Sequence, residues 1–217
     1  MLMERKRKIV LVSLLAALLP FPLFSHPHIF ITSTFEFVWE KTALKGVYLN
    51  WEFDRFFSAD IIRGFDKNKD GVFDATETKA VYQNAFINLK NYHFFTFIRQ
   101  GKKRYNPSSV EKFSVSQKNG VLTYRFYVDL SSYPKGDLFL AVYDYTFFCE
   151  VRYDEKKPVT LSYDPTLVKP SYIIQENRDY PVYYDPLSPA SDTTIHTTWK
   201  KGLATFYPKE IRIYYEP

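Results

Sequence analysis

The clearest chemical signal in the sequence is an acidic loop in the segment FDKNKDGVFDATE, residues 65–77. Oxygen-bearing side chains recur there at fixed intervals from Asp66, and Gly71 stands at the sixth position, where the chain must turn sharply. A hard cation such as Ca²⁺ takes about six to eight oxygen ligands. The spacing therefore predicts an EF-hand-like calcium loop. Its ligands would be Asp66, Asn68, Asp70, the backbone carbonyl of Val72, Asp74 and Glu77.

We expect this calcium to stabilise the fold and not to act as a signal. Sensor EF-hands usually occur in pairs and expose a Met-rich groove when they bind calcium. The sequence holds no second loop of this kind, and its two methionines, Met1 and Met3, both lie in the first 25 residues. An ordinary turn rich in Asp, Asn and Gly is the alternative interpretation of the segment.

Residues 1–25 predict export from the cytoplasm. A basic start, MLMERKRK, precedes an apolar run, and Ser25 is a small residue suited to a cleavage position. The run is short for a membrane-spanning helix, which needs roughly 20 apolar residues. We therefore expect a cleaved signal peptide and a periplasmic or secreted protein. Anchoring in the membrane by an uncleaved signal is the alternative.

Cleavage after Ser25 would make a second candidate site at the new amino terminus, which begins HPHIFI. His26 would offer its α-amine and its imidazole, and His28 a second imidazole, to Ni²⁺, Co²⁺ or Zn²⁺. Pro27 has no backbone N–H, which excludes the square-planar chelate that uses the second amide. Any site must therefore be completed from elsewhere, and the weaker candidates are His93, Asp144 and His196. The alternative is that His26 and His28 bind nothing.

Charge and cysteine content exclude two classes of protein. The net charge is +5, and residues 1–25 carry +3 of it, so the expected mature chain is left with +2. No clustered stripe of Lys and Arg remains, so we do not expect nucleic acid as a partner. The single cysteine, Cys149, excludes an internal disulfide and is expected to be a buried strand thiol.

Most of the chain is expected to form antiparallel strands, because apolar and polar residues alternate. The inward-facing residues of a first hairpin are expected to be Phe35, Phe37 and Trp39, then Val47, Leu49, Trp51 and Phe53. Asn119-Gly120 predicts the turn of a second hairpin, whose second strand is VLTYRFYVDL. Further strands are expected at residues 92–100, 110–117, 137–153, 159–163 and 210–215.

Helical spacing is confined to the flanks of the acidic loop. After the loop, Val81, Ala85 and Leu89 fall on one helix face, and before it Ser58 could cap a short helix. The predicted fold class is α+β and mainly β, an antiparallel sheet or β-sandwich with one inserted EF-hand-like helix-loop-helix. The predicted parts are a signal peptide at 1–25, a β-rich domain at 26–162 with its insert at 58–90, and a Pro- and Tyr-rich C-terminal extension at 163–217, packed on the domain or partly disordered.

Several short motifs, taken in order, resemble a bacterial family of unknown function. Its members are commonly labelled an uncharacterized ABC-type transport system, periplasmic component. The resemblance covers about residues 26–155, and its motifs are HPHIFI, WEFDRFFS, DKNKDG, YHFFTFI and LAVYDYTFF. It implies a periplasmic protein often encoded near nickel, cobalt or zinc permeases, with His26 and His28 as metal contacts and Asp54 and Asp144 worth testing. This chain departs from the family in its high content of Lys, Tyr and Phe.

Catalytic motifs are absent from the sequence, so we do not expect an enzyme. It contains no G-x-S-x-G elbow, no H-E-x-x-H helix and no P-loop. We expect instead an exported accessory protein that binds a divalent transition metal and assists its transport by an inner-membrane metal permease or ABC transporter. The alternative is a calcium-stabilised structural or interaction module of the cell envelope.

Overall fold

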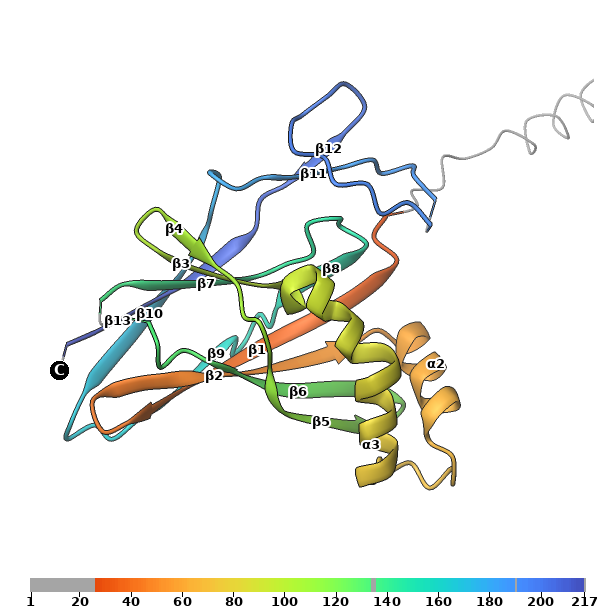
Figure 1. The fold of residues 1–217 in the computed structure, drawn as a ribbon, viewed down its shortest axis with the longest axis horizontal. Coiled ribbons are helices and arrows are strands. Elements are labelled where there is room, and N and C mark those ends of the chain that lie inside the picture. Colours follow the sequence, from red (N-terminus) through yellow and green to blue (C-terminus); the bar gives the residue numbers. More distant parts are fainter. Residues whose placement is uncertain (1–25, 134–135, 190, 217) are drawn as a thin grey trace, which may run out of the picture.

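Two β-sheets that share one hydrophobic core make up most of the structure, a computed structural model that describes residues 26–133, 136–189 and 191–216. The strand order of the first sheet is β5 (Glu111–Lys118), β6 (Val121–Asp129), β2 (Ala43–Phe53), β1 (Ile29–Glu40) and β8 (Cys149–Tyr153) (Figure 1). A further strand, β9 (Val159–Ser162), also pairs with β1. Both β8 and β9 run parallel to β1, while the other neighbours are antiparallel.

The second sheet is antiparallel and contains strands from the middle and the C-terminal part of the sequence. Its order is β10 (Lys169–Glu176), β13 (Lys209–Glu216), β7 (Leu138–Val142), β3 (Thr96–Gln100) and β4 (Lys103–Tyr105). A separate ribbon pairs β11 (Val182–Tyr184) with β12 (Ala204–Phe206). Residues 163–217 thus contribute β10 and β13 to this sheet, and β13 lies between β10 and β7.

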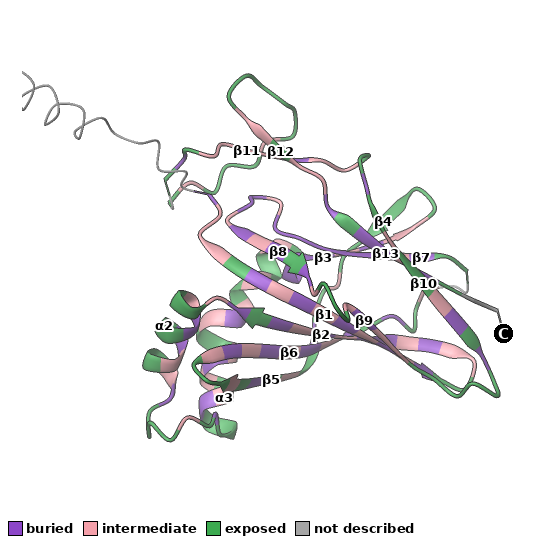
Figure 2. Cartoon of the chain, turned by 180° about the vertical axis from the view of Figure 1, so that it is seen from behind, coloured by how far each residue is buried: buried purple, intermediate pink, exposed green. Residues whose placement is uncertain are grey.

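The core lies between the two sheets and under the helical segments, where buried and less buried residues alternate along the strands (Figure 2). Strand alternation places every second side chain on the same face, and in β1 and β2 that face is the aromatic one. The buried side chains include Phe35, Phe37, Leu49, Trp51 and Phe126 from the first sheet and Ile98, Leu140, Ile211 and Ile213 from the second. The predicted fold class and the inward faces of the first hairpin are confirmed.

The helical insert lies at one end of the first sheet (Figure 1). It consists of α2 (Arg55–Phe65), α3 (Ala75–Val81), a π-helix η1 (Tyr82–Phe86) and a 3₁₀ helix η2 (Ile87–Phe95). Asp54 caps α2, because its carboxylate accepts from the N–H groups of Phe56 and Phe57. The prediction that Ser58 is the cap is wrong. Ser58 is buried within α2, where its hydroxyl donates to the Phe53 carbonyl and accepts from the Leu122 N–H.

Two predicted strands differ from the structure. In residues 92–100 only Thr96 onward is a strand, because His93, Phe94 and Phe95 have φ angles of 57°, 50° and 52° and form a left-handed turn. Residues 137–153 do not form one strand, since β7 and β8 belong to different sheets. The Asn119-Gly120 turn is confirmed between β5 and β6, with φ angles of 53° and 75°.

Candidate functional site

The acidic loop connects α2 to α3, and the first turn of α3 fixes its last two predicted ligands. Asp74 caps α3, with its Oδ1 accepting from the Glu77 N–H at 2.8 Å. Glu77 Oε2 in turn accepts from the Asp74 N–H at 3.2 Å, which completes a capping box. Gly71 has a φ of 78°, a conformation that glycine adopts without strain, at the predicted sharp turn.

Asp66 and Glu77 are the two buried side chains among the predicted ligands, with exposed fractions of 7% and 6%. Asp66 Oδ2 accepts from the Gly71 N–H at 3.0 Å, and Glu77 Oε1 accepts from the Lys67 N–H at 2.7 Å. Asp66 Oδ1 is buried and has no hydrogen-bond partner. A buried carboxylate oxygen without a donor is costly, so this atom is the one in the loop best suited to meet a cation.

The exposed loop residues accept hydrogen bonds from the loop itself. Asn68 Oδ1 accepts from the Asp70 N–H at 3.0 Å, and Asp70 Oδ1 accepts from the Val72 N–H at 2.7 Å. Gln117 on β5, which sequence reasoning missed, donates from Nε2 to the Gly71 carbonyl at 2.7 Å. No local pattern marks Gln117, because only strand pairing brings β5 to the loop.

His26 and His28 lie together just before β1. Their ring centroids are 4.8 Å apart, and the Phe148 ring lies 4.9 Å from that of His28. His26 is 7% exposed, and its Nδ1 is buried without a hydrogen-bond partner. Burial, and then the charge of His26, lowers the pKa of His28 below its ordinary 6.5. His28 is therefore a neutral imidazole at neutral pH, the form that ligates metals.

Asp144 and Asp54, which the family resemblance drew attention to, both organise the backbone. Asp144 Oδ1 accepts from the N–H and the hydroxyl of Thr146, and its Oδ2 accepts from the Cys149 N–H. Asp54 Oδ2 accepts from the Phe30 N–H at 2.9 Å and so ties the start of β1 to the cap of α2. Cys149 is buried as expected, and burial, with Asp144 and Asp54 nearby, raises the pKa of its thiol.

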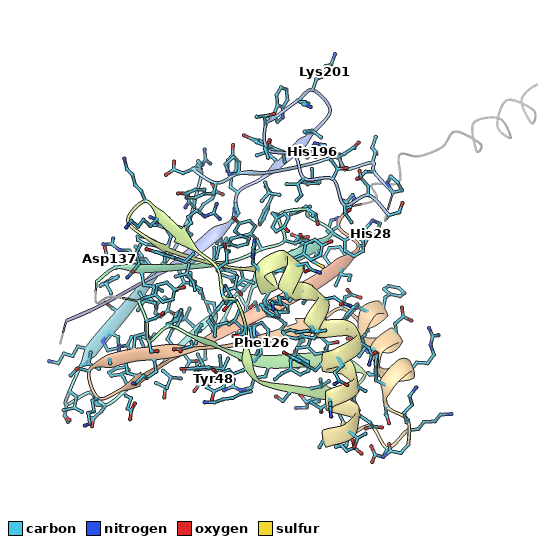
Figure 3. The ribbon with its side chains drawn as sticks, viewed as in Figure 1. His28, Tyr48, Phe126, Asp137, His196 and Lys201 are labelled. Carbon is cyan, nitrogen blue, oxygen red and sulfur yellow. The ribbon has the colours of Figure 1, made fainter. Side chains whose placement is uncertain are left out.

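The structure brings His93 and His196, about a hundred positions apart, to the wall of one open groove of about 510 Å³. Figure 3 shows His196 beside β11 and His28 at the start of β1. In the groove the Arg104 guanidinium lies 4.1 Å from the Tyr180 ring centroid and donates to the Tyr143 hydroxyl at 2.5 Å. Sequence reasoning missed this groove, since its wall comes from several separate elements.

Within the described ranges, no three His, Cys, Asp or Glu side chains are grouped so that they could hold a metal ion. In the acidic loop, Asp70, Asp74 and Glu77 direct oxygens at backbone N–H groups. A calcium ion would have to draw these carboxylates away from the backbone. The predicted ligands therefore stay predictions.

The predicted signal peptide, residues 1–25, lies outside the described residues. In the part of the chain that is described, no helix is both long and apolar enough to cross a membrane.

Comparison with known proteins places most of the chain in one group. Residues 11–215 match the model of a family described as protein of unknown function (DUF1007). A relative from Spirochaeta aurantia, described as an uncharacterized 15.5 kDa protein in trpE 3'region, is 36% identical over 103 residues, which cover 46% of this chain and 74% of the relative. No solved structure matches. Neither description names a ligand, a reaction or a transporter.

Proposed function

We propose that this chain, which belongs to the DUF1007 family of proteins of unknown function, is a non-catalytic, exported accessory protein that binds divalent cations. Calcium occupies the loop of residues 66–77 and stabilises the helical insert. His26 and His28 receive Ni²⁺, Co²⁺ or Zn²⁺ and present it to a membrane metal permease, the kind of partner that the family resemblance implies.

One observation carries the calcium proposal: the buried Asp66 Oδ1 lacks a partner at the first ligand position of the loop. The Gly71 N–H donates to the other oxygen of the same carboxylate. The Asp66 side chain is therefore already held in one orientation before an ion meets Oδ1. Calcium then draws in Asp70 and Glu77, which exchange backbone N–H partners for the ion. In an extracytoplasmic compartment a weak site, with a dissociation constant on the order of 10⁻⁴ to 10⁻³ M, is sufficient.

A calcium titration of thermal stability tests this proposal. Free calcium at about 10 to 100 times the dissociation constant adds about 1.4 to 2.7 kcal/mol to stability. For a domain of this size that raises the melting temperature by about 3–10 °C. Asp66→Asn and Glu77→Gln should lose most of this rise, because each weakens a charged ligand.

Asp60→Asn is the matched control, because Asp60 lies on α2 outside the loop and pairs with the exposed Arg63. It should keep the calcium-dependent rise. An equal rise in wild type, Asp66→Asn and Glu77→Gln contradicts calcium binding in this loop.

The transition-metal proposal is supported by the adjacent imidazoles of His26 and His28 and by the unpartnered His26 Nδ1. The α-amine that cleavage after Ser25 would release supplies a third nitrogen. Two imidazoles and an amine suit a late divalent transition metal and leave positions open for transfer to a partner. No step of the proposal requires His93, His196 or Asp144, whose carboxylate already accepts three hydrogen bonds.

Isothermal titration with Ni²⁺, Co²⁺ and Zn²⁺ on protein that begins at His26 tests the histidine site. The double variant His26→Ala, His28→Ala should lose binding, and the control His93→Ala, His196→Ala should keep it. Equal binding by wild type and the first double variant removes the metal-delivery proposal, and loss only in the control moves the site to the groove that contains His93 and His196.

A second candidate function is a calcium-stabilised interaction module of the envelope, without a transition metal. The observation that favours it is the exposure of large apolar side chains on the segment between β11 and β12. Leu187, Ile195 and Trp199 are 59%, 53% and 58% exposed there, which suits a protein partner. If the protein binds no transition metal and still binds a protein partner, that result favours this function.

A further inference from the structure

An apolar cavity of about 280 Å³ lies between the helical insert and the first sheet. Its buried wall consists of side chains from β1, β2, β6, β8 and the helical segments, among them Trp51, Phe86, Phe95 and Tyr124. Packing defects of this size are few in a protein domain, because interiors are close-packed. The cavity is distinct from the acidic loop and from the histidine pair.

Part of the cavity wall is partly exposed to solvent. Phe57, Ala85 and Leu89 also line it, and these three residues are only half-buried, whereas Trp51 and Phe86 are 0% and 1% exposed. Phe57 comes from α2 and Ala85 from the π-helix η1, so these two segments form part of the less buried wall. Single-turn π-helices are rare and frequently occur at functional sites.

Two side chains of the wall carry hydrogen-bond donors without partners. Trp51 Nε1 and the Tyr124 hydroxyl are both buried and unpaired. Burial raises the pKa of Tyr124, so its hydroxyl keeps its proton and donates. Buried donors are nearly always paired in folded proteins, and a bound acceptor is one way to pair them.

Size and wall chemistry limit the ligand. A cavity of about 150 Å³ lined by apolar side chains holds benzene, so by proportion this one holds roughly ten to twelve non-hydrogen atoms. Burying a charge in an apolar wall without a partner is too costly. The ligand is therefore uncharged and largely apolar, with an oxygen that can accept a hydrogen bond.

We propose that the cavity between α2, η1 and the first sheet binds a small uncharged apolar molecule with one acceptor oxygen, such as an aryl ketone. The apolar part fills the space against Phe86 and Phe95, and the oxygen accepts from Tyr124 or Trp51. This binding is independent of calcium in the acidic loop and of metal at His26 and His28.

Two nearly isosteric probes test the proposal on the whole protein. Acetophenone carries the acceptor oxygen, and α-methylstyrene replaces it with a methylene group. In ligand-observed NMR titrations, wild type should bind both, and acetophenone about threefold to tenfold more tightly, the value of one hydrogen bond. Tyr124→Phe should reduce this preference. Equal affinities in wild type contradict the acceptor site, and no binding of either probe overturns the proposal.

The position of the site is tested by filling it. Ala85→Leu adds three carbon atoms at the wall and should abolish binding of both probes, while Ala59→Leu, on the exposed side of α2, should leave binding unchanged. Unchanged binding in Ala85→Leu overturns the assignment to this cavity. If that variant does not fold, wild-type crystals under xenon decide: xenon in the cavity supports the proposal, and an empty cavity overturns it.

Discussion

Asp66 and Asp144 are both buried carboxylates, but their oxygens meet different numbers of donors. The donors to Asp144 come from Thr146, in the loop between β7 and β8, and from Cys149, at the start of β8, and both of its oxygens are used. Asp66 has one backbone donor on Oδ2 and none on Oδ1. The same residue type therefore holds a turn in one place and leaves one buried oxygen without a donor in the other.

Asp144→Ala should lower the free energy of unfolding by about 1–3 kcal/mol, because it leaves buried donors without an acceptor. Burial raises the pKa of Asp144 above its ordinary 3.8, so the folded state favours the protonated carboxyl. Its stabilising contribution is then fully present below pH 3.8 and decreases as pH rises through the folded pKa. Urea unfolding should show that Asp144→Ala loses more free energy of unfolding near pH 4 than near pH 7.

Asp164→Ala is the control for that prediction. Asp164 accepts from the N–H and the hydroxyl of Thr166, as Asp144 does from Thr146, but it is fully exposed. Water replaces the lost acceptor, so Asp164→Ala should lower the free energy of unfolding less than Asp144→Ala does. Those hydrogen bonds lower the pKa of Asp164, so its pH dependence should have the opposite sign. A loss as large as that of Asp144→Ala would contradict the role assigned to burial.

At the scale of elements, the close approach of β2 and β6 depends on Gly46. A Cβ atom added at Gly46 would lie 2.3 Å from the Tyr127 ring and 2.5 Å from the Val128 carbonyl oxygen. The ring of Tyr127 covers the glycine, and burial, followed by Asp129, Tyr48 and Glu111, raises the pKa of its hydroxyl to about 12. The strand pair therefore tolerates no side chain at this position.

Gly46→Ala should lower the free energy of unfolding by at least about 1–3 kcal/mol, the usual cost of overpacking, because the backbone of β6 must move. Gly64→Ala, in the helix α2, is the matched control. A Cβ there meets no atom within 4 Å, and alanine is favoured over glycine in a helix by about 0.5–1 kcal/mol. Denaturant unfolding of both variants measures these changes, and a neutral Gly46→Ala would show that β2 and β6 can separate.

At the scale of the whole molecule, the C-terminal segment completes the second sheet. β13 lies between β10 and β7, and Ile211 and Ile213 are fully buried in the common core. The chain must therefore be nearly complete before this sheet can form, because β7 and β13 are about seventy positions apart. Long-range pairing of this kind slows folding.

Ile211→Ala should lower the free energy of unfolding by about 2–5 kcal/mol, the range for truncating a fully buried isoleucine. Ile195→Ala is the control, since Ile195 is 53% exposed and should change stability by no more than about 0.5 kcal/mol. Thermal unfolding of both variants measures the difference. Equal small effects would mean that β13 is not part of the cooperative core.

The sequence by itself determined the features that depend on neighbours along the chain. The aromatic faces of β1 and β2, the Asn119-Gly120 turn and the spacing of the acidic loop all follow from local periodicity and turn chemistry. It was less reliable where a competing local group acts, as Asp54 does in place of Ser58 as the cap of α2.

Only the tertiary structure decided which distant residues meet. Strand order placed Gln117 against the acidic loop, His93 with His196 in one groove, and Trp51 with Tyr124 around a cavity. A strand's alternation fixes which side chains share a face but not which strand lies beside it, because that choice depends on how two whole sheets bury their apolar faces together.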